Sequence, residues 1–182
     1  MESSFDPSAS VAFTTFTSGM APPFLGLNTT VNATAVSGIA PDTALLDTNI
    51  LVYAYNADSE YHTTCRALLD RATKGELNAC LAPQILFEFF AVVTNPARVA
   101  KPITPTEALD EMTKLADSLS LITPPMNVHD NVINLMRQLG FGSKHIYDVV
   151  LAATMLSNGV ARLYTYDVER FQKIPGIRVL DI

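Results

Sequence analysis

Five short apolar runs, separated by segments of helical length, constrain the fold of this chain more than any other feature of its sequence. The runs cover residues 44–46, 78–81, 119–122, 162–166 and 177–180. They are too short for helices, and mostly apolar residues without alternation are typical of strands that are buried on both faces. Strands that alternate with helices predict a parallel sheet with helices on both sides, so we expect an α/β fold.

The segments between these runs carry the signals of helix ends. Pro83 suits the first turn of a helix that closes at Asn95-Pro96, and Thr104-Pro105-Thr106-Glu107 is a capping box with proline at the first helical position. Glycines close three other segments. We therefore expect helices over residues 59–74, 83–94, 127–139 and 146–157, and one that begins at residue 105.

Residues 1–42 differ from the rest of the chain in charge and composition. This stretch contains no Lys or Arg, is dominated by Ser, Thr, Ala, Gly and Pro, and shows no sustained periodicity. It has neither the basic start and compact apolar segment of a secretory signal nor the arginines of a transit peptide. We therefore expect a low-complexity, disordered extension or an over-called translation start, followed by one domain at residues 43–182.

Composition limits the class of protein. Hydrophobic residues make up 48% of the 182 residues, which is enough for a sizeable core. The longest apolar run, residues 85–93, is interrupted by Glu88 and is far shorter than the roughly 20 residues of a membrane helix. Two cysteines are too few for a disulfide scaffold and fit a reducing compartment. We expect a cytoplasmic protein without a membrane span.

Four carboxylates occupy positions that a structural role explains poorly. Asp47 and Asp167 directly follow predicted strands, and the carboxyl ends of parallel strands are where open α/β sheets place their ligands. Glu88 and Asp148 are each the only charge in an apolar helical stretch, so we expect both to be buried. Several acids that meet without bases repel one another unless a cation lies between them. Oxygen ligands suit Mg²⁺ or Mn²⁺, so the pattern predicts a divalent-metal site.

Each acid also has an ordinary structural interpretation. Asp47 can cap the loop that follows it, and Glu88 can pair with an arginine from elsewhere in the chain. Asp148 gains from the dipole of its helix whatever its function, and Asp167 can be a turn residue. His145 lies close to Asp148 in sequence, but we interpret it as a surface loop histidine rather than a general base.

Four motifs together resemble the PIN domain family. They are Leu-Leu-Asp-Thr-Asn-Ile-Leu-Val-Tyr at residues 45–53, Tyr-Asp-Val-Val-Leu-Ala-Ala-Thr at 147–154, Leu-Tyr-Thr-Tyr-Asp-Val-Glu-Arg-Phe at 163–171 and Ile-Pro-Gly-Ile-Arg-Val-Leu at 174–180. Together with Glu88, they occur in the order and rough spacing of that family. The resemblance covers residues 44–182, and the style of the motifs is most similar to the VapC-type toxins of bacterial toxin–antitoxin pairs.

The resemblance implies a three-layer PIN-like fold and a metal-dependent endoribonuclease. Asp47 and Asp148 are then direct ligands of Mg²⁺, or of Mn²⁺ in its place. Glu88 completes the site directly or through water, and Asp167 holds a second metal ion or its waters. These four residues are the candidate catalytic and metal-binding residues.

Two neutral polar residues stand beside the acids. Asn49 and Thr165 can orient a carboxylate, a water or a phosphate, although both are equally compatible with ordinary loop and strand positions.

The partners that follow from the resemblance are an RNA substrate, a cognate antitoxin protein and a second copy of the chain. The whole chain has a net charge of −6, which argues against a broad basic platform for nucleic acid. Residues 44–182 hold 12 basic and 15 acidic residues, so the domain without the four candidate acids carries one net positive charge. Lys144, Arg98, Lys101 and Arg170 are available to line the approach. We expect a homodimer through the helices at 59–74 and 83–94.

Other functions remain open from the sequence alone. One is a catalytically silent PIN-like or receiver-like acidic module that acts in protein binding. A receiver needs a Lys after a late strand, and none follows residues 163–165. Another is a phosphatase with an aspartate nucleophile, which usually needs a second Asp two residues after the first, where this chain has Asn49.

Overall fold

The computed structural model describes residues 39–182. The predicted extension, residues 1–42, therefore lies outside the described residues except for its last four. Those last four are attached to the domain, since Ile39 packs against the hydrophobic core and the Asp42 carboxylate accepts hydrogen bonds of 2.8 and 2.9 Å from Nδ2 of Asn78.

Five parallel strands form one sheet in the order β3-β2-β1-β4-β5. The strands are β1 (Ala44–Leu46), β2 (Ala79–Leu81), β3 (Ser120–Leu121), β4 (Arg162–Tyr164) and β5 (Arg178–Leu180). The prediction of a parallel sheet is confirmed, and the strands lie inside the predicted runs but are mostly shorter. β1 is central because it pairs with both β2 and β4, so the residues that follow β1 and β4 emerge side by side.

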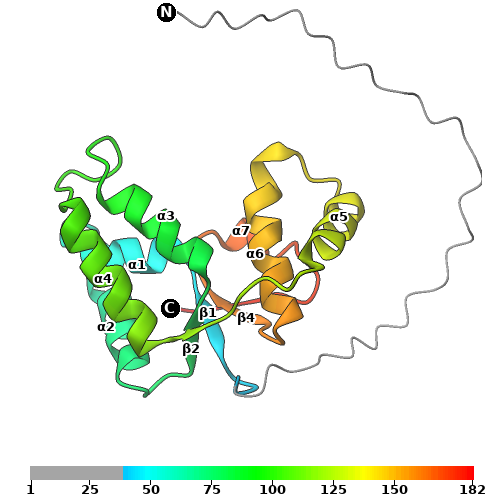
Figure 1. Ribbon diagram of the computed structural model, residues 1–182, viewed down its shortest axis with the longest axis horizontal. Coiled ribbons are helices and arrows are strands. Elements are labelled where there is room, and N and C mark those ends of the chain that lie inside the picture. Colours follow the sequence, from blue (N-terminus) through cyan, green and yellow to red (C-terminus); the bar gives the residue numbers. More distant parts are fainter. Residues whose placement is uncertain (1–38) are drawn as a thin grey trace, which may run out of the picture. The chain divides into compact units, whose positions relative to one another are not determined.

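Helices flank the sheet on two sides, as the α/β prediction requires. They are α1 (Thr48–Tyr55), α2 (His62–Thr73), α3 (Pro83–Val93), α4 (Pro105–Ser118), α5 (Val128–Leu139), α6 (Ile146–Ser157) and α7 (Val168–Phe171), with a 3₁₀ turn, η1 (Ser143–His145), before α6. Figure 1 shows α1 to α4 on one side of the strands and α5 and α6 on the other. No helix in residues 39–182 is long and apolar enough to cross a membrane.

The predicted end signals act as expected in α4 and α5. Thr104 Oγ1 accepts a 3.2 Å hydrogen bond from the Glu107 backbone N–H, and Glu107 Oε2 accepts one of 2.8 Å from the Thr104 N–H. This reciprocal pair is the capping box predicted at the start of α4. Gly140 closes α5 with a φ of 63°, in the left-handed region that residues with a Cβ rarely adopt.

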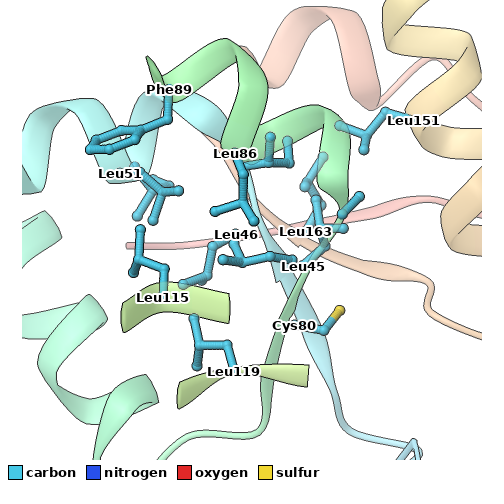
Figure 2. Close-up of a cluster of buried hydrophobic side chains, with 14 of the residues drawn as sticks. Leu45, Leu46, Leu51, Cys80, Leu86, Phe89, Leu115, Leu119, Leu151 and Leu163 are labelled. Atoms are coloured by element: carbon cyan, nitrogen blue, oxygen red, sulfur yellow. The ribbon is translucent and has the colours of Figure 1, made fainter. Parts of the chain in front are cut away.

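The hydrophobic core joins the central strands to the helices on both sides. Figure 2 shows Leu45 and Leu46 of β1, Cys80 of β2 and Leu163 of β4 beside side chains from the helices. Those helical side chains include Leu51 of α1, Leu86 and Phe89 of α3, Leu115 of α4 and Leu151 of α6. Because β1 is buried along its whole length, the packing fixes where the chain leaves the sheet and hence where Asp47 lies.

Candidate active site

Asp47 leaves the carboxyl end of β1 and caps the N-terminus of α1. Its side chain is only 7% exposed, and Oδ1 accepts a 2.7 Å hydrogen bond from the Thr48 backbone N–H. Oδ2 accepts two more, of 2.9 Å from Asn49 Nδ2 and 2.5 Å from Thr165 Oγ1. The predicted cap is therefore real, but it caps a helix rather than a loop. All three donors are neutral, so they fix the orientation of the carboxylate without neutralising its charge.

Asn49 and Thr165 belong to this network rather than to the ordinary loop and strand surface. Thr165 follows β4, is 1% exposed, and its hydroxyl accepts hydrogen bonds from Asn49 Nδ2 at 3.0 Å and from the Asp167 N–H at 2.9 Å. Asn49 Oδ1 accepts a hydrogen bond of 3.2 Å from the Tyr166 N–H. With its donation to Asp47, the Thr165 hydroxyl uses its one proton and both lone pairs. The two residues therefore position Asp47 and the turn that carries Asp167.

Burial makes the Asp47 carboxylate an unusually weak acid. Desolvation raises the pKa of Asp47 from 3.8 to about 6, and the hydrogen bonds from Thr165 and Thr48 only partly oppose this effect. The negative charges of Asp167 and Glu88 raise the pKa further, which places both acids within electrostatic reach of Asp47. A cation bound beside this carboxylate would favour its ionised form and lower its pKa again.

Glu88 is an exposed residue of α3, and the prediction that it is buried is wrong. Helix α3 buries Ile85, Leu86 and Phe89, and its outward face carries Phe87 and Glu88 together. Glu88 Oε2 accepts a 2.8 Å hydrogen bond from Thr48 Oγ1 at the start of α1. The alternative of a buried ion pair is not found, because no Lys or Arg in residues 39–182 lies within ion-pair distance of Glu88.

Asp148 lies in the first turn of α6 with its side chain 19% exposed. Its Oδ2 atom is buried and has no hydrogen-bond partner among the described residues. The basic groups within 4 Å of this oxygen are His145 Nδ1 at 3.6 Å and Arg170 Nη1 at 3.8 Å. A buried carboxylate oxygen without a partner is costly unless a cation or an ordered water completes it. Asp148 Oδ2 is therefore available to a ligand.

Asp167 lies beyond the carboxyl end of β4, as the strand pattern predicted, and occupies the N-cap position of the short helix α7 without a side-chain capping hydrogen bond. Its side chain is 51% exposed, and Oδ2 lies 3.8 Å from Arg170 Nη1. The same Arg170 nitrogen is 3.8 Å from Asp148 Oδ2, so one guanidinium faces two of the candidate acids. Arg170 was expected only on the approach to the site, and the structure places it among the carboxylates.

The four predicted acids line one pocket of about 400 Å³. Asp47, Glu88, Asp148 and Asp167 come from four different elements, and Arg98 and Arg170 line the same pocket. Within residues 39–182, no three His, Cys, Asp or Glu side chains are grouped closely enough to hold one metal ion in this conformation. The structure therefore places all four acids on one pocket, although they are not drawn together around a single point.

The family model for the PIN domain matches residues 44–177. This chain belongs to the PIN domain family. The match covers β1 to β4 and includes the four acids. The resemblance predicted from the motifs is therefore confirmed.

Relatives of this PIN domain carry VapC names. Ribonuclease VapC37 of Mycobacterium tuberculosis is 29% identical over 139 residues, covering 74% of this chain and 93% of that protein. Among solved structures, DNA-bound VapBC from Salmonella typhimurium has a TM-score of 0.56 at 20% identity, covering 76% of this chain and 97% of that one. A toxin–antitoxin complex from Klebsiella pneumoniae has a TM-score of 0.52 at 15% identity, covering 76% and 96%. At these identities the solved structures show a common fold.

The chemistry of the acids in this PIN domain suits a hard divalent cation, although no three of them are grouped around one point in residues 39–182. The donor set consists of carboxylate oxygens, Asp148 Oδ2 has no hydrogen-bond partner among the described residues, and ionised Asp47 is destabilised where it lies. In the described part of the chain, two basic side chains lie within 4 Å of Asp148, those of Arg170 and His145. Arg170 is also the one basic side chain there that lies within 4 Å of Asp167. The Arg170 guanidinium, 3.8 Å from both acids, partly offsets their negative charge, as a bound metal ion would.

Three residues of the site escaped prediction from the sequence or were misjudged. Thr48 links Asp47 to Glu88, and its place directly after a capping Asp was the available signal. His145 is not a surface loop histidine, since its side chain is 18% exposed and stacks on Phe141 with ring centroids 4.5 Å apart. Arg170 follows Asp167 by three residues, the spacing at which helical side chains meet.

Proposed function

We propose that this chain is a Mg²⁺-dependent endoribonuclease of the VapC type that hydrolyses RNA phosphodiester bonds, with Mn²⁺ able to replace Mg²⁺. The observation that carries the proposal is the single pocket lined by Asp47, Glu88, Asp148 and Asp167, in which Asp148 Oδ2 has no hydrogen-bond partner among the described residues. The relative VapC37 is named a ribonuclease, and the match covers nearly all of that protein.

Asp47 and Asp148 would hold the metal directly. Glu88 would complete the site directly or through water, and Asp167 would hold a second ion or its waters. A bound divalent cation supplies Lewis-acid polarisation of the phosphate and a bound water of lowered pKa. Asn49 and Thr165 keep the Asp47 carboxylate turned toward the pocket. Arg170 and Arg98 supply positive charge on the pocket wall, where an anionic phosphate group enters.

The proposal includes a cognate antitoxin and a homodimer. The structural relatives include VapBC complexes, which supports an antitoxin partner for this chain. Helices α2 and α3 were expected to form the dimer interface. Helix α2 exposes no large hydrophobic side chain, so we no longer include α2 in the proposed interface. Helix α4 packs against α3 and exposes Leu109 by 53%, so we place the dimer interface over α3 and α4.

A catalytically silent PIN-like module remains the second candidate. The observation in its favour is that no three metal-ligating side chains in residues 39–182 are grouped around one point. Arg170 is consistent with either function, because it stabilises Asp148 and Asp167 when no metal ion is bound. The two candidates differ in one measurable property, which is the response to divalent cations.

The test combines metal binding with cleavage. Mg²⁺ should raise the melting temperature of the purified chain, because a ligand that binds only the native state stabilises it. The rise should shrink in Asp47→Asn and in Asp148→Asn. Cleavage of RNA should require Mg²⁺ or Mn²⁺ and stop with EDTA, and each of these substitutions, like Glu88→Gln, should reduce kcat/KM by at least about 100-fold.

Asp130→Asn is the matched control for these substitutions. Asp130 also lies in the first turn of a helix, but its side chain is 64% exposed and it does not line the pocket. Its substitution should change neither the Mg²⁺ response nor cleavage. Equal Mg²⁺ responses in the wild type and in Asp148→Asn would reject the metal site, and cleavage that persists in EDTA would reject metal dependence.

A further inference from the structure

His145 is a half-buried histidine to which neither the fold nor the proposed function has given a role. It is the N-cap residue of α6, but its side chain makes no capping hydrogen bond. Its Nδ1 atom is buried and has no hydrogen-bond partner among the described residues. A buried nitrogen in this state costs free energy, because it has given up water without gaining another partner. The position of this ring therefore needs an explanation other than the cap of α6.

The His145 Nδ1 atom faces Asp148 Oδ2, which is 3.6 Å away. Asp148 follows three residues later, the spacing at which helical side chains meet. Both atoms are buried, and neither has a hydrogen-bond partner in residues 39–182. A separation of 3.6 Å is too long for a hydrogen bond, and an approach by roughly 0.6 Å would give the usual N–H···O distance. Two unsatisfied atoms of complementary kinds are therefore placed opposite each other.

The carboxylate determines which His145 nitrogen carries a proton. An unprotonated Nδ1 is an acceptor, and its lone pair would face the negative Asp148 oxygen at 3.6 Å. A protonated Nδ1 is a donor directed at an acceptor. Both the neutral tautomer with a proton on Nδ1 and the imidazolium present this N–H, so the donor does not depend on the charge of the ring.

Packing holds the His145 ring in this orientation. The ring stacks on Phe141 with centroids 4.5 Å apart and an interplanar angle of 35°. Phe141 in turn packs against the hydrophobic core. The backbone is also fixed, because the His145 N–H donates a 3.1 Å hydrogen bond to the Gly142 carbonyl oxygen within η1. A donor that is held by its surroundings is what the orientation of a second side chain requires.

His145 differs from Arg170, the other basic group beside Asp148 Oδ2. Arg170 is half exposed and lies equally close to Asp167, at 3.8 Å, so it does not define one position for Asp148. Its permanent positive charge also opposes the arrival of a cation at the same acid. A neutral imidazole N–H adds no such charge. Because a carboxylate oxygen has two lone pairs, Oδ2 can accept from Nδ1 with one and face an ion with the other.

We propose that His145 is a positioning residue, whose Nδ1–H donates to Asp148 Oδ2 and holds this carboxylate in the orientation that binds a divalent cation. This inference rests on the proposed function, and specifically on its metal site. His145 touches neither substrate nor ion, so its contribution is to cation affinity and not to the chemical step. Residues that orient a metal ligand through a hydrogen bond contribute about 10- to 100-fold in metal affinity.

The experiment measures Mn²⁺ binding by the full chain, from the electron paramagnetic resonance signal of the free ion. His145→Phe keeps a ring that can stack on Phe141 but removes both nitrogens, and it should weaken Mn²⁺ binding by at least about 10-fold. His145→Asn places an amide N–H the same number of bonds from the backbone as Nδ1. It should therefore restore binding to within about threefold of the wild type.

His129→Phe is the matched control for the loss of the imidazole. His129 also lies beside an acid, with Nε2 3.4 Å from Asp130 Oδ1, but its side chain is 67% exposed and it does not line the pocket. Its substitution should leave Mn²⁺ binding unchanged. A fall in affinity equal to that of His145→Phe would show a general effect of losing a histidine and would overturn the inference.

The Mg²⁺ dependence of RNA cleavage gives a second measurement. In His145→Phe, the Mg²⁺ concentration for half-maximal cleavage should rise by the same factor as the Mn²⁺ dissociation constant. At saturating Mg²⁺, kcat should return to within about threefold of the wild type, because the bound ion then holds Asp148 in place. Damage to the structure of the site would instead lower kcat at every Mg²⁺ concentration.

The outcomes separate this inference from the proposed function. Equal Mn²⁺ binding in the wild type and in His145→Phe, with cleavage intact, would overturn the positioning role and leave the nuclease standing. A folded His145→Asn that binds as weakly as His145→Phe would overturn the hydrogen bond. Mn²⁺ binding that depends on His145 without any cleavage would support the inference and reject the nuclease. Circular dichroism establishes that each variant folds, and His145→Phe, which keeps the packing, decides alone if His145→Asn does not fold.

Discussion

Asp47 shows how a carboxylate can be oriented and yet left uncompensated. Its three hydrogen-bond donors are neutral, and the ionisable groups that act on it most strongly, Asp167 and Glu88, are negative. The backbone geometry of β1 and α1 keeps the side chain buried regardless of this cost. Without a cation, the domain is therefore less stable with Asp47 ionised than with Asp47 protonated.

This cost predicts an unusual pH dependence of stability. The folded-state pKa of Asp47, about 6, lies above the ordinary 3.8, so the folded protein binds this proton more tightly than the unfolded chain. The free energy of unfolding should therefore fall as pH rises from about 4 to about 6, by up to roughly 3 kcal/mol from this residue. Urea unfolding in EDTA measures it, as the difference between the wild type and Asp47→Asn at each pH.

Other groups titrate in the same range, and the difference between the two proteins removes their common contribution. The wild type should lose stability relative to Asp47→Asn between pH 4 and pH 6, with little further change above pH 7. A difference that stays constant from pH 4 to pH 7 would show that Asp47 is not destabilised by burial. Saturating Mg²⁺ should flatten the curve, because metal binding requires the ionised carboxylate.

Glu88 is predicted to matter for activity and not for stability. It is exposed, has no ion-pair partner in residues 39–182, and accepts one hydrogen bond from Thr48 Oγ1, which the amide oxygen of Gln can also accept. Glu88→Gln should change the free energy of unfolding in EDTA by less than about 1 kcal/mol. Cleavage should fall by at least about 100-fold.

Urea unfolding and cleavage assays of the wild type and Glu88→Gln together decide whether Glu88 acts in catalysis or in stability. A loss of more than about 2 kcal/mol would place Glu88 in a structural interaction, because stranding the partner of a buried ion pair costs about 3–5 kcal/mol. Asp130→Asn is again the comparison, since Asp130 is an exposed carboxylate that does not line the pocket.

At the scale of elements, the sequence predicted the strands and most helices and missed α1 and the short α7. The motif Thr-Asn-Ile-Leu-Val-Tyr-Ala-Tyr is apolar with β-branched and aromatic residues, so it shows little helical periodicity. Its one local signal is Asp47 as N-cap.

The burial of Glu88 was misjudged for a related reason. Helix α3 looked apolar all round, whereas Phe87 is in fact exposed, and composition alone cannot tell a buried ring from one that lines a pocket.

The capping box of α4 should contribute measurably to stability. Thr104→Ala removes the hydroxyl that accepts from the Glu107 N–H, which should lower the free energy of unfolding by about 1 kcal/mol. Thr113→Ala in the same helix is the control. Its hydroxyl donates to the Leu109 carbonyl oxygen, and alanine is the better helix former, so stability should stay equal or rise slightly. Equal losses in the two variants would reject the cap.

At the scale of the molecule, the spacing of strands and helices was enough to predict a parallel sheet with its site at the carboxyl ends. The strand order was not predictable from that spacing. In that order β1 pairs with β4 as well as with β2. The pairing with β4 brings Asp47 beside Thr165. Arg170 among the acids was also beyond the sequence, since its partner Asp148 comes from a different helix.

The proposed homodimer makes a prediction about mass. Light scattering at tens of micromolar should give about twice the 19.7 kDa of one chain. Leu109→Lys should reduce it to one chain, because a charge replaces an apolar side chain at the proposed α4 interface. Thr63→Lys on α2, which exposes no large hydrophobic side chain, should leave the dimer intact. A monomer in the wild type would contradict the homodimer.

The position of β1 also sets the order in which the site can be assembled during translation. This first strand forms the middle of the sheet, and one of its two edges stays unpaired until β4 has left the ribosome. Thr165, which holds Asp47 from 118 residues away, follows β4, as does Asp167. Pairing across so long a stretch of chain forms late in folding. The proposed ribonuclease would therefore have no complete site while it is being made, and it could not cut the messenger or the ribosomal RNA of the ribosome that is synthesising it.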